Sequence, residues 1–132
     1  MPFAIKADIL DAAATHFAFA AQKTMYGGKR IAKGDVIFVF AREQGLVARG
    51  TVTAAEAVPK KRGIARRTPR VSIAVRRTAR AKRSLGRDEL KRFADWKDGR
   101  PETELNFKFY RQATNKIVGI SERAAGFLAK HF

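Results

Sequence analysis

The feature that most constrains the fold is the run of residues 36–41, Val-Ile-Phe-Val-Phe-Ala, whose first five members are β-branched or aromatic. Because side chains alternate between the two faces of a strand, a strand of this sequence is apolar on both faces and must be buried on both. The turn Lys33-Gly34-Asp35 precedes the run. The run is far too short to cross a bilayer, so it predicts a buried strand of a soluble protein.

Further segments have the composition of short strands. They are residues 17–21, 46–53, 71–75, 105–110 and 117–120, the last of which extends or pairs with the segment before it. Residues 17–21 alternate aromatic with small side chains, and a helix continuing through this alanine-rich stretch is the alternative. Residues 105–110 alternate too, with Leu105, Phe107 and Phe109 on one face.

Short helices are predicted between these strands. Asp8 caps a helix over the alanine-rich residues that follow it, residues 86–93 form a second helix, and Ser121 caps a final one. Residues 96–101 are predicted to be a loop. Gly50 marks a bulge or sharp bend in its strand.

These elements predict an α+β fold, a small mixed β-barrel of about five to six strands that is flanked by short helices. The regular alternation of strands and helices that a doubly wound sheet requires is absent. A chain of 132 residues is expected to form one domain, residues 1–132, and can bury a core without covalent cross-links. The chain has no cysteine, which excludes disulfides and thiolate metal sites.

Positive charge is concentrated in one part of the chain. Of the 33 residues from 60 to 92, 14 are Lys or Arg and two are acidic, so this segment carries +12 of the chain's net charge of +16. Residues 59–70 are predicted to form a basic, flexible loop. Such clustering is typical of a surface that binds polyanions, because each neutralised phosphate releases condensed counterions. The sequence therefore predicts a nucleic-acid partner, either RNA or DNA, and the alternative is a solvated, solubilising face.

Other sites and locations have little support in the sequence. The N-terminal residues include Lys6, Asp8 and Asp11 and lack the features of a signal peptide, so we expect a cytoplasmic protein with no membrane association. His16 and His131 are isolated, with no second ligand at metal-binding spacing. No glycine-rich phosphate-binding motif occurs. We therefore predict neither a metal nor a cofactor.

Two parts of the chain resemble the PUA-like superfamily, and more narrowly its EVE and ASCH branches. In residues 33–40 a turn with lysine, glycine and aspartate enters an apolar strand, and the return strand at 45–52 carries a glycine between apolar residues. In residues 107–125 an aromatic segment, an apolar strand and the opening of a last helix follow one another as in EVE domains. The resemblance spans about residues 16–130.

The resemblance implies a small β-barrel, flanked by helices, that reads nucleic acid. EVE domains take an extruded, modified base into an aromatic-lined pocket beside the first strand, and by this resemblance residues 23–30 line such a pocket. Some ASCH proteins instead hydrolyse an acylated cytosine derivative with a Lys, a Thr and a Glu. Here Lys23 and Thr24 invite that comparison, with Glu56, Glu102 or Glu104 as the third member.

A pocket that reads a base needs an aromatic face for stacking and polar groups for the base edge. Trp96, the only tryptophan, lies among charged residues, so it is the best candidate for stacking; the alternative is that it covers the end of the barrel. Tyr26 lies beside two glycines that let the backbone approach a ligand. The predicted pocket residues are Lys23, Thr24, Tyr26, Trp96, Tyr110, Arg111, Gln112 and Asn115.

Cations of the basic segment are predicted to contact phosphates: Lys60, Lys61, Arg62, Arg66, Arg67, Arg70, Arg76 and Arg77. The predicted function is a nucleic-acid-binding module that recognises a modified base, with no catalytic residues. One alternative is a small hydrolase acting on a modified nucleobase or nucleoside. Another is an interaction protein whose basic face docks on an RNA–protein assembly.

Overall fold

The computed structural model describes residues 2–42, 44–59, 70–109 and 116–132, and six strands of this part close into a barrel in the order β1-β3-β4-β5-β2-β6. The strands are β1 Phe3–Ala7, β2 His16–Met25, β3 Val36–Ala41, β4 Gly45–Ala57, β5 Arg70–Arg80 and β6 Lys116–Gly119. β1 pairs in parallel with β3, and β2 with β6, whereas the other neighbours are antiparallel. The predicted small mixed barrel is confirmed.

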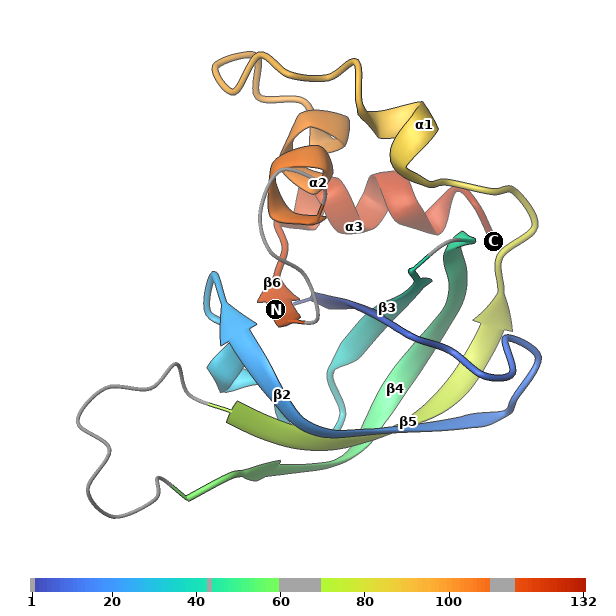
Figure 1. Ribbon diagram of the computed structural model, residues 1–132, viewed down its shortest axis with the longest axis vertical. Coiled ribbons are helices and arrows are strands. Elements are labelled where there is room, and N and C mark those ends of the chain that lie inside the picture. Colours follow the sequence, from blue (N-terminus) through green and yellow to red (C-terminus); the bar gives the residue numbers. More distant parts are fainter. Residues whose placement is uncertain (1, 43, 60–69, 110–115) are drawn as a thin grey trace.

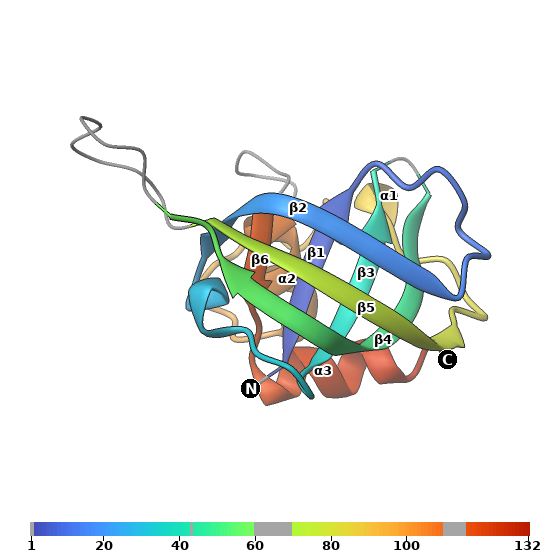
Figure 2. The ribbon, with the colours of Figure 1, turned by 90° about the horizontal axis from the view of Figure 1, so that it is seen from below.

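The helices lie outside the barrel. They are the short 3-10 helix η1 Gly28–Arg30 and the α-helices α1 Arg87–Leu90, α2 Pro101–Phe109 and α3 Glu122–Ala129. The three α-helices lie together over one side of the barrel (Figure 1), and the opposite side is formed by β2, β5 and β4 (Figure 2). Within the described residues, no helix has the length and apolar character needed to cross a bilayer.

β3 separates two hydrophobic clusters, which is why both of its faces are apolar. Ile37 and Val39 point into the barrel, where they pack with side chains from β1, β2, β4 and β5. Phe38 and Phe40 point outward, into a second cluster that the helices cover. The prediction that this strand is buried on both faces is confirmed, and the second cluster fixes the helices against the barrel.

One predicted strand is wrong, because the residues of the predicted strand 105–110 belong to helix α2 as far as Phe109. Pro101 occupies the first helical position, and acidic residues stand in the first turn, where a fixed φ and negative charge favour a helix start. Leu105 and Phe109 are both buried, and their spacing of four residues fits one face of a helix as well as one face of a strand.

The predicted helix after Asp8 is also wrong. Residues 8–15 form a loop, in which the Asp11 carboxylate accepts a hydrogen bond from the backbone N–H of Ala13 at 2.9 Å. A bond from an Asp side chain to the backbone two residues on stabilises a turn in competition with a helix. Strand β1 was not predicted, because it contains Lys6 and lacks a run of β-branched residues.

Two other local predictions stand apart: residues 60–69 of the predicted loop 59–70 lie outside the described residues, and β6 pairs with β1 and β2 instead of extending or pairing with residues 105–110. Three more are confirmed. Helix α1 lies within residues 86–93, and the Ser121 hydroxyl caps α3 by accepting a hydrogen bond from the backbone N–H of Ala124 at 3.0 Å. The pairing of β4 with β5 shifts register between Arg49 and Gly50, as expected for a bulge.

Candidate functional site

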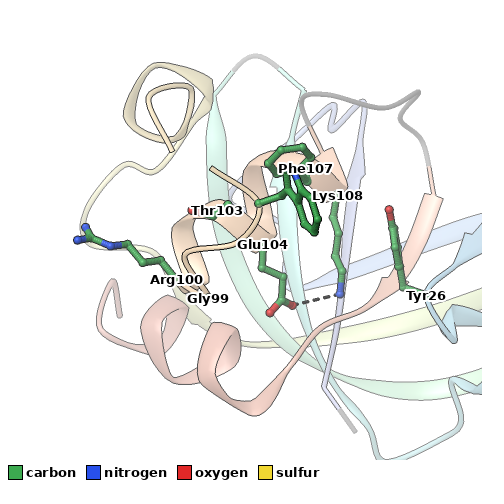
Figure 3. Close-up of a pocket in the computed structure, with 8 residues that line it drawn as sticks. Tyr26, Gly99, Arg100, Thr103, Glu104, Phe107 and Lys108 are labelled. Carbon is green, nitrogen blue, oxygen red and sulfur yellow. Dashed lines mark hydrogen bonds and ion pairs between the residues drawn. The ribbon is translucent and has the colours of Figure 1, made fainter. Parts of the chain in front are cut away.

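A cavity of about 270 Å³ lies between the turn that follows β2 and helix α2. The residues that line it are Tyr26, Trp96, Gly99, Arg100, Thr103, Glu104, Phe107 and Lys108. Its three aromatic side chains come from three segments: the turn after β2, the loop before α2, and α2 itself. In Figure 3 the ring of Tyr26 faces the end of the Lys108 side chain, while Arg100 points away from the other labelled side chains.

The backbone is strained where Tyr26 enters the cavity wall. The φ angle of Tyr26 is +53° and that of Gly27 is +82°, both in the left-handed region. For a residue other than glycine this conformation costs about 1 kcal/mol, and such strain is concentrated at ligand sites and turns. The side chain of Tyr26 remains 41% exposed, so the turn holds an aromatic ring at the surface rather than in the core.

A half-buried ion pair forms part of the cavity wall. The Lys108 Nζ lies 3.1 Å from Glu104 Oε2 and donates to the Gly119 carbonyl at 2.7 Å. The same ammonium lies 4.7 Å from the centre of the Tyr26 ring, which is within the range of a cation–π interaction (Figure 3). Since these three partners hold Lys108 from different sides, its position is fixed in the absence of a ligand.

Glu104 is held as a carboxylate by its neighbours. Burial by itself would raise the pKa of Glu104, but hydrogen bonds from the Ser121 hydroxyl and backbone N–H, together with the Lys108 ammonium, outweigh burial and lower the pKa below its usual value. At neutral pH the side chain is therefore an acceptor of hydrogen bonds with a fixed position.

Trp96 lies in a loop that two hydrogen bonds attach to α2. On the N-terminal side of Trp96, the Phe93 carbonyl accepts a hydrogen bond from Asn106 Nδ2 at 3.0 Å. On its C-terminal side, the Asp98 carboxylate accepts one from the Thr103 hydroxyl at 3.0 Å. The indole itself is 71% exposed. An apolar ring this exposed, on a loop anchored at both ends, is available to a flat ligand.

The C-terminal end of α2 is attached to the barrel through Lys6. Its Nζ donates to the Phe109 carbonyl at 3.2 Å, where a cation interacts favourably with the helix dipole. Burial lowers the pKa of Lys6, and the positive charges of Arg42 and Arg87 lower it further. The helix that carries Phe107 and the ion pair is thus fixed to β1 at this end.

The structure brings together Tyr26 and Trp96, two of the predicted pocket residues, in one cavity. It separates Lys23 and Thr24 from that cavity and from each other. Lys23 is exposed on the outside of β2, while Thr24 is only 5% exposed, because successive side chains of a strand point to opposite faces. A hydrolase in which Lys23 and Thr24 act on one substrate does not fit this geometry.

The other predicted pocket residues lie outside the described residues. They are Tyr110, Arg111, Gln112 and Asn115, and the same holds for the predicted phosphate contacts Lys60, Lys61, Arg62, Arg66 and Arg67. The remaining predicted phosphate contacts, Arg70, Arg76 and Arg77, are on β5. Arg70 and Arg77 donate to the carbonyls of Ala21 and Ala13, at 3.1 and 2.7 Å.

Sequence reasoning missed Phe107 and Lys108 as cavity residues, and it considered Glu104 only as a catalytic residue. A signal was present: Glu104 and Lys108 are four residues apart with the acidic residue first, the preferred order for an ion pair on one face of a helix. Within the described part of the chain, no three His, Asp or Glu side chains group closely enough to hold a metal ion.

By sequence, the chain matches no protein-family model and no curated protein. By structure, it matches solved proteins over almost its whole length. The DUF55 domain of human thymocyte nuclear protein 1 is 11% identical, with a TM-score of 0.65. The superposition covers 98% of this chain and 97% of that domain. A protein from Pseudomonas putida is 15% identical, with a TM-score of 0.65 and complete coverage of both chains.

A third match is human THYN1 in complex with DNA that contains 5-methylcytosine, at 13% identity, a TM-score of 0.66, and coverage of 98% of this chain and 95% of that one. The chain shares the fold of these proteins. The predicted fold class, a small mixed β-barrel flanked by short helices, is thereby confirmed, and at identities of 11–15% the likeness shows the fold alone.

Proposed function

We propose that this protein binds nucleic acid and takes one extruded, modified base into the cavity between Tyr26, Trp96 and Phe107. The observation that carries the proposal is an aromatic-lined cavity on a chain with a net charge of +16. Pockets for drug-sized ligands measure roughly 300–1,000 Å³, so a cavity of about 270 Å³ suits a single flat ring. A human protein of the same fold is bound to DNA, which supports this class of partner.

Stacking on the aromatic rings supplies most of the affinity for the base, about 1–3 kcal/mol per stacked base. The carboxylate of Glu104 is an acceptor, so it favours a base edge that presents a donor, such as an exocyclic amino group. The ammonium of Lys108 is already bound to Glu104, Gly119 and the Tyr26 ring. Its role is to hold that wall in place.

The strand on either side of the base is held by phosphate contacts from the basic segment. The proposed contacts are Lys60, Lys61, Arg62, Arg66, Arg67, Arg70, Arg76 and Arg77. The EVE resemblance implies the other half of this binding, an extruded base in an aromatic pocket. The separation of Lys23 from Thr24 favours it over the ASCH-type hydrolase.

The proposal is tested by titrating fluorescently labelled single-stranded DNA and RNA, with and without a modified base, into the protein and following anisotropy. Because Trp96 is the only tryptophan, stacking of a base on it also quenches the intrinsic fluorescence. Trp96→Ala and Phe107→Ala are each expected to weaken binding about tenfold, the equivalent of one lost stacking contact. The dependence of affinity on salt stays unchanged, because no phosphate contact is lost.

Leu10→Ala is the control for these variants, because Leu10 is a fully exposed apolar side chain that does not line the cavity. It is expected to leave affinity unchanged. If Trp96→Ala and Phe107→Ala bind as tightly as Leu10→Ala, the cavity is not the site of the base. Binding that is weakened only by loss of cations would then indicate a charged surface without a pocket.

A further inference from the structure

Three cations lie abreast on neighbouring strands of the barrel. In the strand register, Lys23 of β2 is the Cα partner of Arg70 in β5 on one side and of Lys116 in β6 on the other. Residues directly opposite each other in a ladder point to the same face, with Cβ atoms roughly 5 Å apart. The order β5-β2-β6 therefore places Lys23 between Arg70 and Lys116, and we name these three residues the cationic row.

The cationic row is unfavourable in the free protein. Like charges directly opposite each other in a sheet are destabilising. The ion pairs among the described residues are Arg42–Asp8, Lys91–Asp88 and Lys108–Glu104, and none of them includes a member of the row. Two of its members have neutral partners, since Arg70 donates to the Ala21 carbonyl at 3.1 Å and the Lys116 Nζ lies 2.9 Å from the Met25 sulfur. These contacts orient the charges without neutralising them.

The row lies directly beside the aromatic cavity. Met25, which the Lys116 ammonium contacts, precedes Tyr26 of the cavity wall in the chain. Two strand spacings separate the outer members of the row, which is roughly 10 Å. A nucleic-acid strand carries one negative charge per roughly 3.4 Å of helix axis, so the row is wide enough to meet more than one phosphate.

We propose that the cationic row is a binding site for the phosphodiester backbone next to the extruded base, with Lys116 nearest the cavity and Arg70 farthest along the strand. The inference rests on the proposed function. It adds the direction in which the nucleic-acid strand leaves the cavity, which is across β6, then β2, then β5. It assigns Lys116 to phosphate binding, and it moves Lys23 from base recognition to phosphate recognition.

The test combines two measurements on Lys23→Gln and Lys116→Gln. In the free protein, each substitution removes like-charge repulsion, so the urea midpoint is expected to rise. With a labelled single-stranded oligonucleotide, each is expected to reduce the slope of log affinity against log salt by about 0.7, which corresponds to about fivefold weaker binding at 0.1 M salt. A gain in stability together with a loss of affinity distinguishes a phosphate site from a structural cation.

Lys130→Gln is the matched control. It makes the same change of charge at an exposed site just beyond α3. The C-terminus that follows α3 lies across the molecule from β6 (Figures 1 and 2). Lys130→Gln is expected neither to raise the urea midpoint nor to change the salt slope. If Lys23→Gln and Lys116→Gln give the slope of Lys130→Gln, the row does not bind phosphates and the proposal is overturned.

The same experiment separates this proposal from the proposed function. Binding that depends on the cationic row but is unaffected by Trp96→Ala and Phe107→Ala would refute the base pocket and retain the row. Binding that depends on the two aromatic residues while Lys23→Gln and Lys116→Gln keep the wild-type slope would refute the row alone. A protein that binds no oligonucleotide under any salt condition refutes both.

Discussion

Replacing Glu104 by glutamine tests whether the cavity wall depends on a carboxylate. The substitution preserves shape: the amide oxygen can take the place of Oε2, which accepts hydrogen bonds from Lys108 Nζ at 3.1 Å and the Ser121 N–H at 2.9 Å. The amide nitrogen then faces the Ser121 hydroxyl, which can rotate to accept a hydrogen bond. Packing is therefore conserved, and the change isolates the contribution of the negative charge.

The size of the effect follows from the three hydrogen bonds that this carboxylate accepts. A hydrogen bond to a charged group is about twice as strong as a neutral one, which contributes about 1 kcal/mol net. Losing the charge therefore removes up to about 1 kcal/mol from each of the three bonds. The loss is smaller than this maximum because the Glu104 side chain is 23% exposed and its charge is partly screened by water. We expect Glu104→Gln to lower the free energy of unfolding by about 2 kcal/mol at pH 7, measured by urea denaturation.

The pH dependence of this difference is the sharper observation. The pKa of Glu104 is lower in the folded protein than in the unfolded chain. At pH values between these two pKa values the folded state binds fewer protons than the unfolded state, so stability rises with pH in that range. The contribution of the carboxylate is complete above the unfolded pKa of about 4.3 and is lost as pH falls through the folded pKa. The difference between the wild type and Glu104→Gln should therefore shrink on acidification.

Glu102→Gln serves as the control, because it neutralises an acidic residue in the first turn of the same helix. Loss of its favourable interaction with the helix dipole is expected to cost about 0.5 kcal/mol. A cost for Glu104→Gln no larger than that for Glu102→Gln, or one that stays constant from pH 7 to pH 3, would refute the reasoning about the charge.

Three further substitutions test packing and electrostatics. Gly50→Ala is expected to cost about 2 kcal/mol in urea denaturation, because an added Cβ would lie 2.5 Å from Val75 Cγ1 and 2.7 Å from a backbone oxygen. Gly126→Ala in α3, where an added Cβ meets nothing within 4 Å, is expected to stabilise by about 1 kcal/mol; equal effects of the two would contradict the packing argument. Lys108→Met removes a charge that lowers the pKa of Glu104, so carboxyl NMR titration should report a higher pKa; an unchanged value would show that the ammonium has no influence.

The sequence predicts those strands whose burial is visible in their own residues. β3 is the clearest case, because hydrophobic clusters on both of its faces require apolar side chains at every position. β1 is equally buried but contains Lys6, whose ammonium donates to the Phe109 carbonyl, 103 residues further along the chain. No local pattern carries that information, so the strand could be found only with the fold in hand.

Helix α2 shows why apolar alternation can mislead. Leu105 and Phe109 share a face in a strand, which has a period of two, and also in a helix, where positions four apart are neighbours. Phe107 distinguishes the two, because a strand would bury it with the others, whereas the helix turns it toward the cavity. The deciding signals lay earlier in the chain, in Pro101 and the acidic first turn.

The cavity combines residues that could be chosen from sequence with residues that could not. Trp96 was a candidate because it lies among charged residues, whereas a tryptophan of the core usually has apolar neighbours. Tyr26 was a candidate because it lies beside two glycines in a segment that the resemblance places at the pocket. Their meeting in one cavity depends on the packing of α2 against β6 and α3. Phe107 and Lys108 follow only once residues 101–109 are assigned to a helix, since their directions differ between a strand and a helix.

Helix α2 therefore links the core to the cavity. Leu105 and Phe109 are buried on one face, while Glu104 and Lys108 on the cavity side bond to Ser121 and Gly119 at the junction of β6 and α3. Because these bonds exist in the free protein, the polar wall is formed before any ligand arrives. A base entering the cavity would meet groups already in place, so the main cost of binding is unstacking the base from its neighbours rather than ordering this wall. Under the proposed function, this distribution of cost would favour bases that are already weakly stacked or mispaired.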